Sequence, residues 1–175
     1  MKHILLLMIF LTAACFAAEP IQVTIDVPGI GLIPGDGPKE TIAGLAYQHE
    51  IVSPRDPVSG QATGRRQHKP FTIVKAIDPA TPQLYQCLAD NRSGMTVTLK
   101  FFKPATQGGA GEEYYTIVLQ GAAVASLRNW KPNTRDLSAD RAGDLEEVSF
   151  VYTSITWTYT KGGITATDTW STVNP

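Results

Sequence analysis

The sequence predicts one mainly β or α+β domain, folded as a sandwich or a barrel, with a single helix. Three observations lead to this prediction. Most of the chain divides into segments in which apolar and polar residues alternate with period two, as in strands that bury one face. Turns rich in glycine and proline separate these segments. Only one segment has the spacing of an amphipathic helix.

About eight strands are expected. The first, IQVTIDV at residues 21–27, alternates without interruption and precedes a loop at residues 28–39 that is rich in glycine and proline. Gly121 is expected to separate two later strands, and Gly162 and Gly163 to turn the chain into the last one. The other predicted strands are residues 40–52, 70–77, 94–102, 113–120, 122–130, 145–159 and 164–170.

Residues 78–91, DPATPQLYQCLADN, form the predicted helix. Asp78 or Thr81 can accept hydrogen bonds from the free N–H groups of its first turn, and Pro82 suits that turn. Leu84, Cys87 and Leu88 follow at helical spacing. Cys87 is therefore expected to fill the core rather than to act as a reactive thiol.

The first 18 residues have the pattern of a secretory signal peptide: a basic start, an apolar run and small residues before the cleavage site. Cleavage before Ala18 or one residue later fits equally well. Lipidation of Cys15 is the alternative, although Thr12 stands where an aliphatic residue is expected. Either way, residues 19–175 are expected to form one domain.

Removing residues 1–18 leaves 157 residues with a net charge of −2 and one cysteine, Cys87. The remaining chain therefore has no internal disulfide, and its stability depends on a core or on assembly. A slightly acidic domain is not attracted as a whole to nucleic acid or to anionic lipid. Arg65, Arg66 and Lys69 could touch phosphates and Phe71 could stack on a base, but no basic stripe continues elsewhere. We expect neither nucleic-acid binding nor stable membrane insertion.

Catalytic motifs are absent. His49 or His68 could be combined with Ser53 or Ser59 and with Asp56 or Asp78, but the sequence lacks the G-x-S-x-G turn that would present a serine. The histidines and the cysteine lack zinc-ligand spacing. The pairs Glu112–Glu113 and Glu146–Glu147 point to opposite faces of their strands and are expected at a solvated sheet edge. We expect no catalytic residue, no cofactor site and no metal site.

The long polar segment at residues 53–69 fits a protein partner better. Seventeen residues without predicted structure are unusual in a compact domain, and the segment ends in GRRQHK, whose arginines suit pairing with carboxylates. An oppositely charged patch on an identical subunit would favour a head-to-tail contact, which closes into rings or continues as tubes. A solvated loop is the equal alternative. The candidate acidic complement is Asp136, Asp140, Asp144, Glu146 and Glu147.

Four stretches resemble the Hcp family, the hemolysin-coregulated proteins that form the inner tube of type VI secretion systems. They are residues 51–88, which contain SPRDPVSGQATGRRQHKPF, then 112–130, 145–159 and 162–170, and the similarity extends from about Ile21 to Trp170. The resemblance implies two packed antiparallel sheets that form a small β-barrel with one flanking helix. It also implies a non-enzymatic subunit whose copies form hexameric rings that stack into a tube, with the sheath, the spike and small effector proteins in the lumen as partners.

In the family, the loop that matches residues 53–69 reaches the adjacent ring. The resemblance therefore implies a ring-stacking role for Ser53, Pro54, Arg55, Asp56, Arg65, Arg66, Gln67, His68 and Lys69. One departure is the signal peptide, since typical tube subunits assemble in the cytoplasm and leave through the machine itself. It opens an alternative, in which the chain is exported through the periplasm and acts outside a tube as a ring-shaped carrier or chaperone of small effectors.

Overall fold

The computed structural model describes residues 21–104, 111–131, 133 and 143–170. The predicted signal peptide, residues 1–18, and Cys15 lie outside these ranges. The strands are β1 (Ile21–Val27), β2 (Gly31–Leu32), β3 (Ile42–Gln48), β4 (Ile51–Val52), β5 (Gln67–His68), β6 (Phe71–Ala76), β7 (Met95–Lys103), β8 (Glu112–Trp130), β9 (Leu145–Val151), β10 (Ser154–Tyr159) and β11 (Ile164–Thr169). The helices are the single 3-10 turn η1 (Pro38–Glu40) and α1 (Ala80–Ala89).

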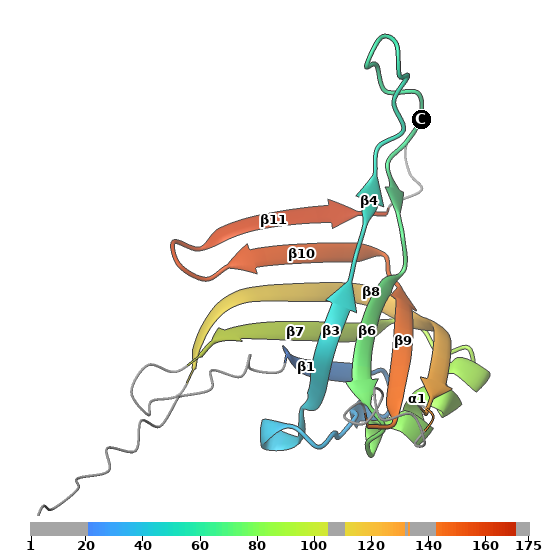
Figure 1. Cartoon of the computed structure of the whole chain (residues 1–175), viewed down its shortest axis with the longest axis vertical. Helices are drawn as coiled ribbons and strands as arrows, with labels where there is room; N and C mark the ends of the chain where they lie inside the picture. The colour runs from blue at the N-terminus through green and yellow to red at the C-terminus, as the bar shows by residue number, and fades with distance from the viewer. Residues whose placement is uncertain (1–20, 105–110, 132, 134–142, 171–175) are drawn as a thin grey trace, which may run out of the picture.

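A closed barrel forms the body of the molecule. β8, β7, β1, β3, β6 and β9 follow one another through antiparallel pairs, and β8 pairs again with β9. This second pairing closes the barrel. Figure 1 shows its two layers, with β3, β6 and β9 crossing in front of β1, β7 and β8. The arrangement confirms the predicted mainly β fold, in which packed antiparallel sheets form a small barrel with one flanking helix.

Closure depends on the length of β8, which has 19 residues. Its first part pairs with β7 on one side and β10 on the other, and its last part pairs with β9. Gly121 lies where the partners change, with a φ of +61°. The prediction that Gly121 separates two strands is therefore wrong. A glycine in left-handed backbone bends one continuous strand here, as glycines do at barrel corners.

The predicted strand at residues 145–159 is instead two strands, β9 and β10. Thr153 lies between them, and both its backbone N–H and its hydroxyl donate to the carbonyl of Gln120 at 2.9 Å. The break in one chain segment thus sits against the bend in the other. Two smaller predictions also need correction. The loop at residues 28–39 contains β2 and most of η1, and the strand predicted at residues 40–52 ends at Gln48 after a bulge near Gly44.

Period-two alternation positions the core as predicted. Met95, Val97, Leu99 and Phe101 of β7 are all buried. Helix α1 begins at Ala80, two residues after the predicted start, and Oδ1 of Asp78 accepts a hydrogen bond from the backbone N–H of Ala80 at 2.9 Å. The remaining buried apolar side chains are Val23, Ile25, Val27, Ile33, Ile42, Phe71, Ile73, Ala80, Leu84, Cys87, Ile117, Leu119, Ala122, Val124, Val148, Phe150, Tyr152 and Ile155. Burial raises the pKa of the Cys87 thiol, which fits its core position.

The bend in β8 generates the first prediction. A Cβ at position 121 would lie 2.2 Å from Oγ1 of Thr153 in backbone that disfavours side chains. The left-handed conformation alone costs about 1–3 kcal/mol. We expect Gly121→Ala to lower the free energy of unfolding, measured by chemical denaturation, by at least about 2 kcal/mol. The control is Gly64→Ala, where the Cβ meets nothing closer than 3.8 Å. Equal losses in the two variants would contradict the account.

Candidate assembly site

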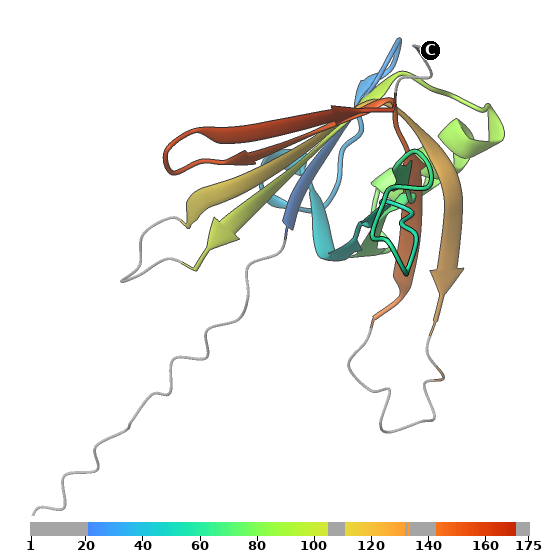
Figure 2. The same ribbon diagram turned by 90° about the horizontal axis from the view of Figure 1, so that it is seen from above.

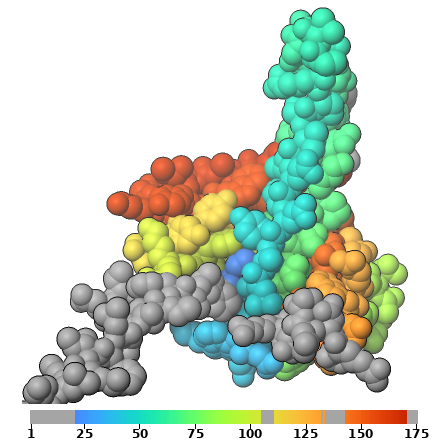
Figure 3. All heavy atoms as spheres, viewed as in Figure 1, coloured from blue at the N-terminus to red at the C-terminus, as the bar shows by residue number. Residues whose placement is uncertain are grey.

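One feature projects far from the barrel: the arm, defined here as residues 51–68 (Figures 1 and 3). β4 and β5 pair along its base. Further out, Arg55 and Ala62 form an antiparallel bridge, and the backbone N–H of Thr63 donates to the carbonyl of Pro54 at 3.0 Å. The segment predicted as a loop is therefore a hydrogen-bonded arm, whose two antiparallel halves form regular strands at the base, in β4 and β5.

The tip of the arm closes on itself. Oδ1 of Asp56 accepts hydrogen bonds from the backbone N–H groups of Val58 at 3.0 Å and Ser59 at 2.6 Å, and from the Ser59 hydroxyl at 2.9 Å. These bonds, led by that from the Ser59 backbone, lower the pKa of Asp56. Arg55 Nη1 donates to the carbonyl of Gly60 at 3.0 Å. The turn leaves Val58 94% exposed at the far end.

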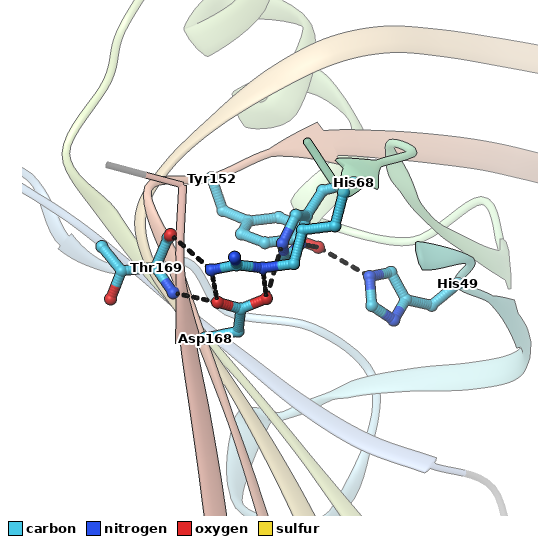
Figure 4. Close-up of polar contacts among 6 residues, drawn as sticks. His49, His68, Tyr152, Asp168 and Thr169 are labelled. Carbon is cyan, nitrogen blue, oxygen red and sulfur yellow. Dashed lines mark hydrogen bonds and ion pairs between the residues drawn. The ribbon is translucent and has the colours of Figure 1, made fainter. Parts of the chain in front are cut away.

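The root network, defined as His49, Arg66, His68, Tyr152 and Asp168, fixes the other end of the arm (Figure 4). Nε2 of His68 lies 3.0 Å from Oδ2 of Asp168, and Nδ1 lies 2.8 Å from the Tyr152 hydroxyl. That hydroxyl is also 2.6 Å from Nε2 of His49. Arg66 donates through Nε and Nη2 to the two oxygens of Asp168. A bidentate pair of this kind fixes direction as well as distance.

The hydrogen-bond balance assigns the tautomers of the two histidines when both are neutral. Because the Asp168 carboxylate only accepts, Nε2 of His68 donates to it and Nδ1 of His68 accepts from the Tyr152 hydroxyl. The Tyr152 oxygen then accepts from Nε2–H of His49. Every polar atom at these contacts has the partner that its chemistry requires.

Burial and charge shift the pKa values in this cluster. The Arg66 hydrogen bond is the main cause that lowers the pKa of Asp168, and His68 adds to the effect. Burial, and to a lesser extent Asp168, raises the pKa of Tyr152, so its hydroxyl stays protonated at neutral pH. Burial, followed by the charge of His68, lowers the pKa of His49. Aromatic rings pack around the pair: Phe71 is 5.1 Å from His49, and Trp170 is 5.5 Å from His68, between centroids.

A second surface is the face of the sheet β11–β10–β8–β7–β1 that points away from the barrel core (Figure 2). Its side chains are mostly threonines in cross-strand register, and the hydroxyls of Thr156 and Thr167 lie 3.0 Å apart. Lys100 on this face pairs with Glu113 at 3.0 Å. The result is a broad polar wall with little unpaired charge. Its threonines are Thr24, Thr96, Thr98, Thr116, Thr156, Thr158, Thr165, Thr167 and Thr169.

Comparison with known proteins decides the family. The model of the family described as "Type VI secretion system effector, Hcp" matches residues 25–159. The "Major exported protein" of Pseudomonas aeruginosa is 34% identical over 135 residues, which cover 77% of this chain and 78% of that protein. The chain belongs to the Hcp family.

Solved Hcp structures share the fold. A crystal structure of an Hcp protein superposes with a TM-score of 0.80 at 28% identity, covering 88% of this chain and 99% of the other. A mutant of Hcp1 from the E. coli EAEC 042 pathovar gives a TM-score of 0.76 at 27% identity, covering 88% and 100%. The Hcp family consists of structural, secreted proteins of type VI secretion systems, so this Hcp protein is not an enzyme.

The structure divides the ring-stacking residues expected in this Hcp chain into two groups. His68 is buried and Arg66 is bonded to Asp168, so both fasten the arm to the barrel, with Gln67 between them in β5. His68 is therefore covered in the isolated subunit, whereas Arg66 and Gln67 remain exposed, and a stacking role for the three residues stays a prediction. Arg65 and Lys69 are exposed and make no ion pair within the described part of the chain. Along the arm, Ser53 and Pro54 follow β4, and Arg55 and Asp56 stabilise its tip.

The expected acidic complement is not one surface. Asp136 and Asp140 lie outside the described residues. Asp144 pairs with Lys131 at 2.8 Å and Glu147 with Arg128 at 3.2 Å, so their charges are already partnered. Glu146 is fully buried, and its Oε1 lies 2.6 Å from Nζ of Lys75. The expectations that Glu146 is a surface residue and that it lies at a solvated edge are both wrong.

Lys75 and Glu146 lie inside the barrel at the end that α1 covers. Nζ of Lys75 also donates to Oδ1 of Asp78 at 2.6 Å, to the Thr81 hydroxyl at 3.2 Å and to the carbonyl of Ala76 at 2.9 Å. This buried ion cluster ties the start of α1 to β6 and β9.

Sequence reasoning missed Tyr152, Asp168 and Lys75. The sequence does contain a signal for the two charged residues. Each occupies a strand position at which period-two alternation predicts an apolar residue. Lys75 follows Phe71 and Ile73, which are buried, at two-residue spacing. Asp168 follows Ile164 and Ala166 at the same spacing, although these two apolar side chains are exposed. A charged side chain at such a position requires a partner, although the partner's identity needs the fold.

Within residues 21–104, 111–131, 133 and 143–170, which the structure describes, no group of three His, Cys, Asp or Glu side chains is placed to hold a metal ion. The Ser59 hydroxyl donates to Asp56 in the arm tip, with no histidine in that contact. No helix in the described part of the chain is long and apolar enough to cross a membrane.

The buried cluster generates the second prediction. Lys75→Met leaves Glu146 and Asp78 buried without their cation, and breaking a buried pair costs about 3–5 kcal/mol. We expect a loss of that size in the free energy of unfolding. Lys131→Met is the matched control, because its pair with Asp144 is exposed and contributes about 0–1 kcal/mol. Similar stability of the two variants in denaturant titrations would contradict the assignment.

Proposed function

We propose that this Hcp protein is a structural subunit of the type VI secretion inner tube, whose copies form hexameric rings that stack through the arm. Family membership supports the tube. The observation that carries the stacking role is the arm itself, which extends from the barrel with its own hydrogen bonds and an exposed tip (Figure 3). An arm ordered in advance loses little conformational entropy when a second ring binds it.

We assign contacts with the neighbouring ring to two exposed cations, one in the arm and one directly after it. Arg65 lies two residues before β5 and Lys69 directly follows it, and both side chains are exposed. Their charge attracts a carboxylate surface over about one Debye length, roughly 10 Å at moderate salt. Ring stacking is therefore expected to weaken as salt concentration rises.

The third prediction follows. The double variant Arg65→Glu/Lys69→Glu should form rings but stack only at protein concentrations about tenfold higher or more, since each 1.4 kcal/mol lost is a factor of ten. Negative-stain images and sedimentation velocity separate rings from stacks. The control is Lys39→Glu/Lys161→Glu, which changes net charge equally at exposed positions outside the arm. Equal stacking of the two double variants would contradict the role of the arm.

A carrier of small effectors is the second candidate, and the threonine wall favours it. A ring needs an inner face that accepts different cargoes without holding them tightly, and hydroxyls offer hydrogen bonds of either polarity at low cost. We place this wall on the lumen side, with effector proteins against it. A carrier requires only single rings, whereas a tube requires stacked rings. Effector binding at a salt concentration that separates the rings would therefore distinguish the two functions.

We also propose that residues 1–18 are a cleaved signal peptide, so that the protein passes through the periplasm before it is secreted. The basic start, apolar run and small exit residues support this. Intact-mass spectrometry of the periplasm and culture supernatant should give a chain that begins at Ala18 or Glu19. A chain that keeps Met1, or one that begins at a lipid-modified Cys15, would overturn this route.

A further inference from the structure

Asp168 lies outside the arm, on β11, yet it holds both polar side chains of the arm root. It is 102 residues from Arg66 and 100 from His68 in the sequence. We propose that Asp168 is a positioning residue that holds the arm at one angle to the barrel, and that the root network survives one proton on its histidine pair but opens with the second. The consequence for ring stacking rests on the proposed function; the effect on the arm itself does not.

The arm's own hydrogen bonds keep it straight but do not set its direction. Those of Thr63, Asp56 and Gly60 join one part of the arm to another. Apart from the two chain connections, the arm's polar contacts with the barrel run from Arg66 and His68 to Asp168, Thr169 and Tyr152, within the described residues. These bonds link the arm to the β10–β11 hairpin and to Tyr152, and Figure 4 shows the contacts of Asp168, His68 and Tyr152 at close range.

The number of protons on His49 and His68 limits which hydrogen bonds the root network can make. With one histidine charged, its nitrogen donates to the Tyr152 oxygen, and the hydroxyl proton then serves the nitrogen of the other, neutral histidine. With both charged, two N–H groups point at the same oxygen. The hydroxyl proton then has no acceptor in the network, and two cationic rings lie 6.5 Å apart between centroids. Either change opposes the contact between His49, Tyr152 and His68.

The charged groups around the pair leave the second proton uncompensated. Asp168 faces His68 but already accepts two hydrogen bonds from Arg66. The neighbouring rings of Phe71, Trp157 and Trp170 carry no charge. Glu50 and Lys69, the other charged neighbours along the two connections, are exposed.

The pKa shifts fix the direction of the pH effect. The pKa of His49 is lowered from its ordinary value of 6.5 by burial and by the charge of His68. A lowered histidine pKa stabilises the network fully above that ordinary value, and the stabilisation is lost as pH falls through the folded-state value. The pKa of Asp168 is also lowered, so its contribution is lost only at still more acidic pH, below 3.8.

The test measures the direction of the arm in the dilute subunit. Spin labels are placed at Val58→Cys on the arm and Ser93→Cys beside α1, both exposed, in a Cys15→Ser chain; Cys87 is buried and does not react. Pulsed electron resonance should give one narrow distance peak at about pH 7.5. Asp168→Asn should lose this narrow peak, and so should Arg66→Gln, which changes a side chain that is 54% exposed and leaves the buried core intact. Asp26→Asn, at an exposed carboxylate of β1, should keep it.

A matched variant tests the proton limit. The parent should lose its narrow peak when the pH is lowered well below 6.5, because the pKa of His49 is lowered from that ordinary value by burial and by the charge of His68. His49→Gln, whose amide can donate or accept, should keep the peak at that pH. Identical distances in Asp168→Asn, Arg66→Gln and the parent would overturn the positioning role. Identical pH behaviour of His49→Gln and the parent would overturn the proton limit. An arm that loses its direction while rings still stack would leave the inference standing and refute the proposed stacking role.

Discussion

The bend of β8 at Gly121 is the constraint on which the rest of the molecule depends. It lets one strand pair with β7 and β10 and then with β9, and so closes the barrel. Thr153 fills the inside of the bend by bonding to Gln120, and its own carbonyl accepts a hydrogen bond from the backbone N–H of Trp170 at 2.6 Å. Tyr152 is the preceding residue, and Asp168 lies two positions before Trp170. The bend therefore places both barrel residues that fasten the arm.

This chain of contacts explains how a small barrel can carry a long projection. A two-stranded ribbon is marginal by itself, and a mobile arm would lose conformational entropy each time it bound a partner. Here the tip is closed by Asp56 and the base by Asp168. The arm is too thin to have a hydrophobic core, and hydrogen bonds to these two carboxylates stabilise it instead.

Much of the fold could be predicted from the sequence, because burial on one face imposes a period of two. The alternation in Met95–Lys103 and the helix around Leu84 and Cys87 followed from local pattern. Gly121 was misjudged because a glycine permits either a turn or a bend, and the choice depends on partners distant in sequence. The break at Thr153 was missed for the same reason, because Thr153 bonds to Gln120 beside the bend in β8.

The candidate site divides in the same way. The cationic segment was recognisable as an unusual feature because its charges are contiguous, and the resemblance to Hcp proteins led to the prediction that it serves assembly. The internal roles of Arg66, His68 and Glu146 were not recognisable. Each is defined by a partner on another strand, and local sequence does not say whether a charged side chain faces water or a buried counter-ion.

The central claim is that the arm is ordered in the isolated subunit, before any partner binds. Hydrogen exchange of dilute protein, followed by NMR, measures this directly at the amides of Asp56, Gly60 and Thr63, which bond to carbonyls within the arm. The account predicts exchange much slower than in an unstructured peptide. Exchange of these amides at the rate of an unstructured peptide would contradict it.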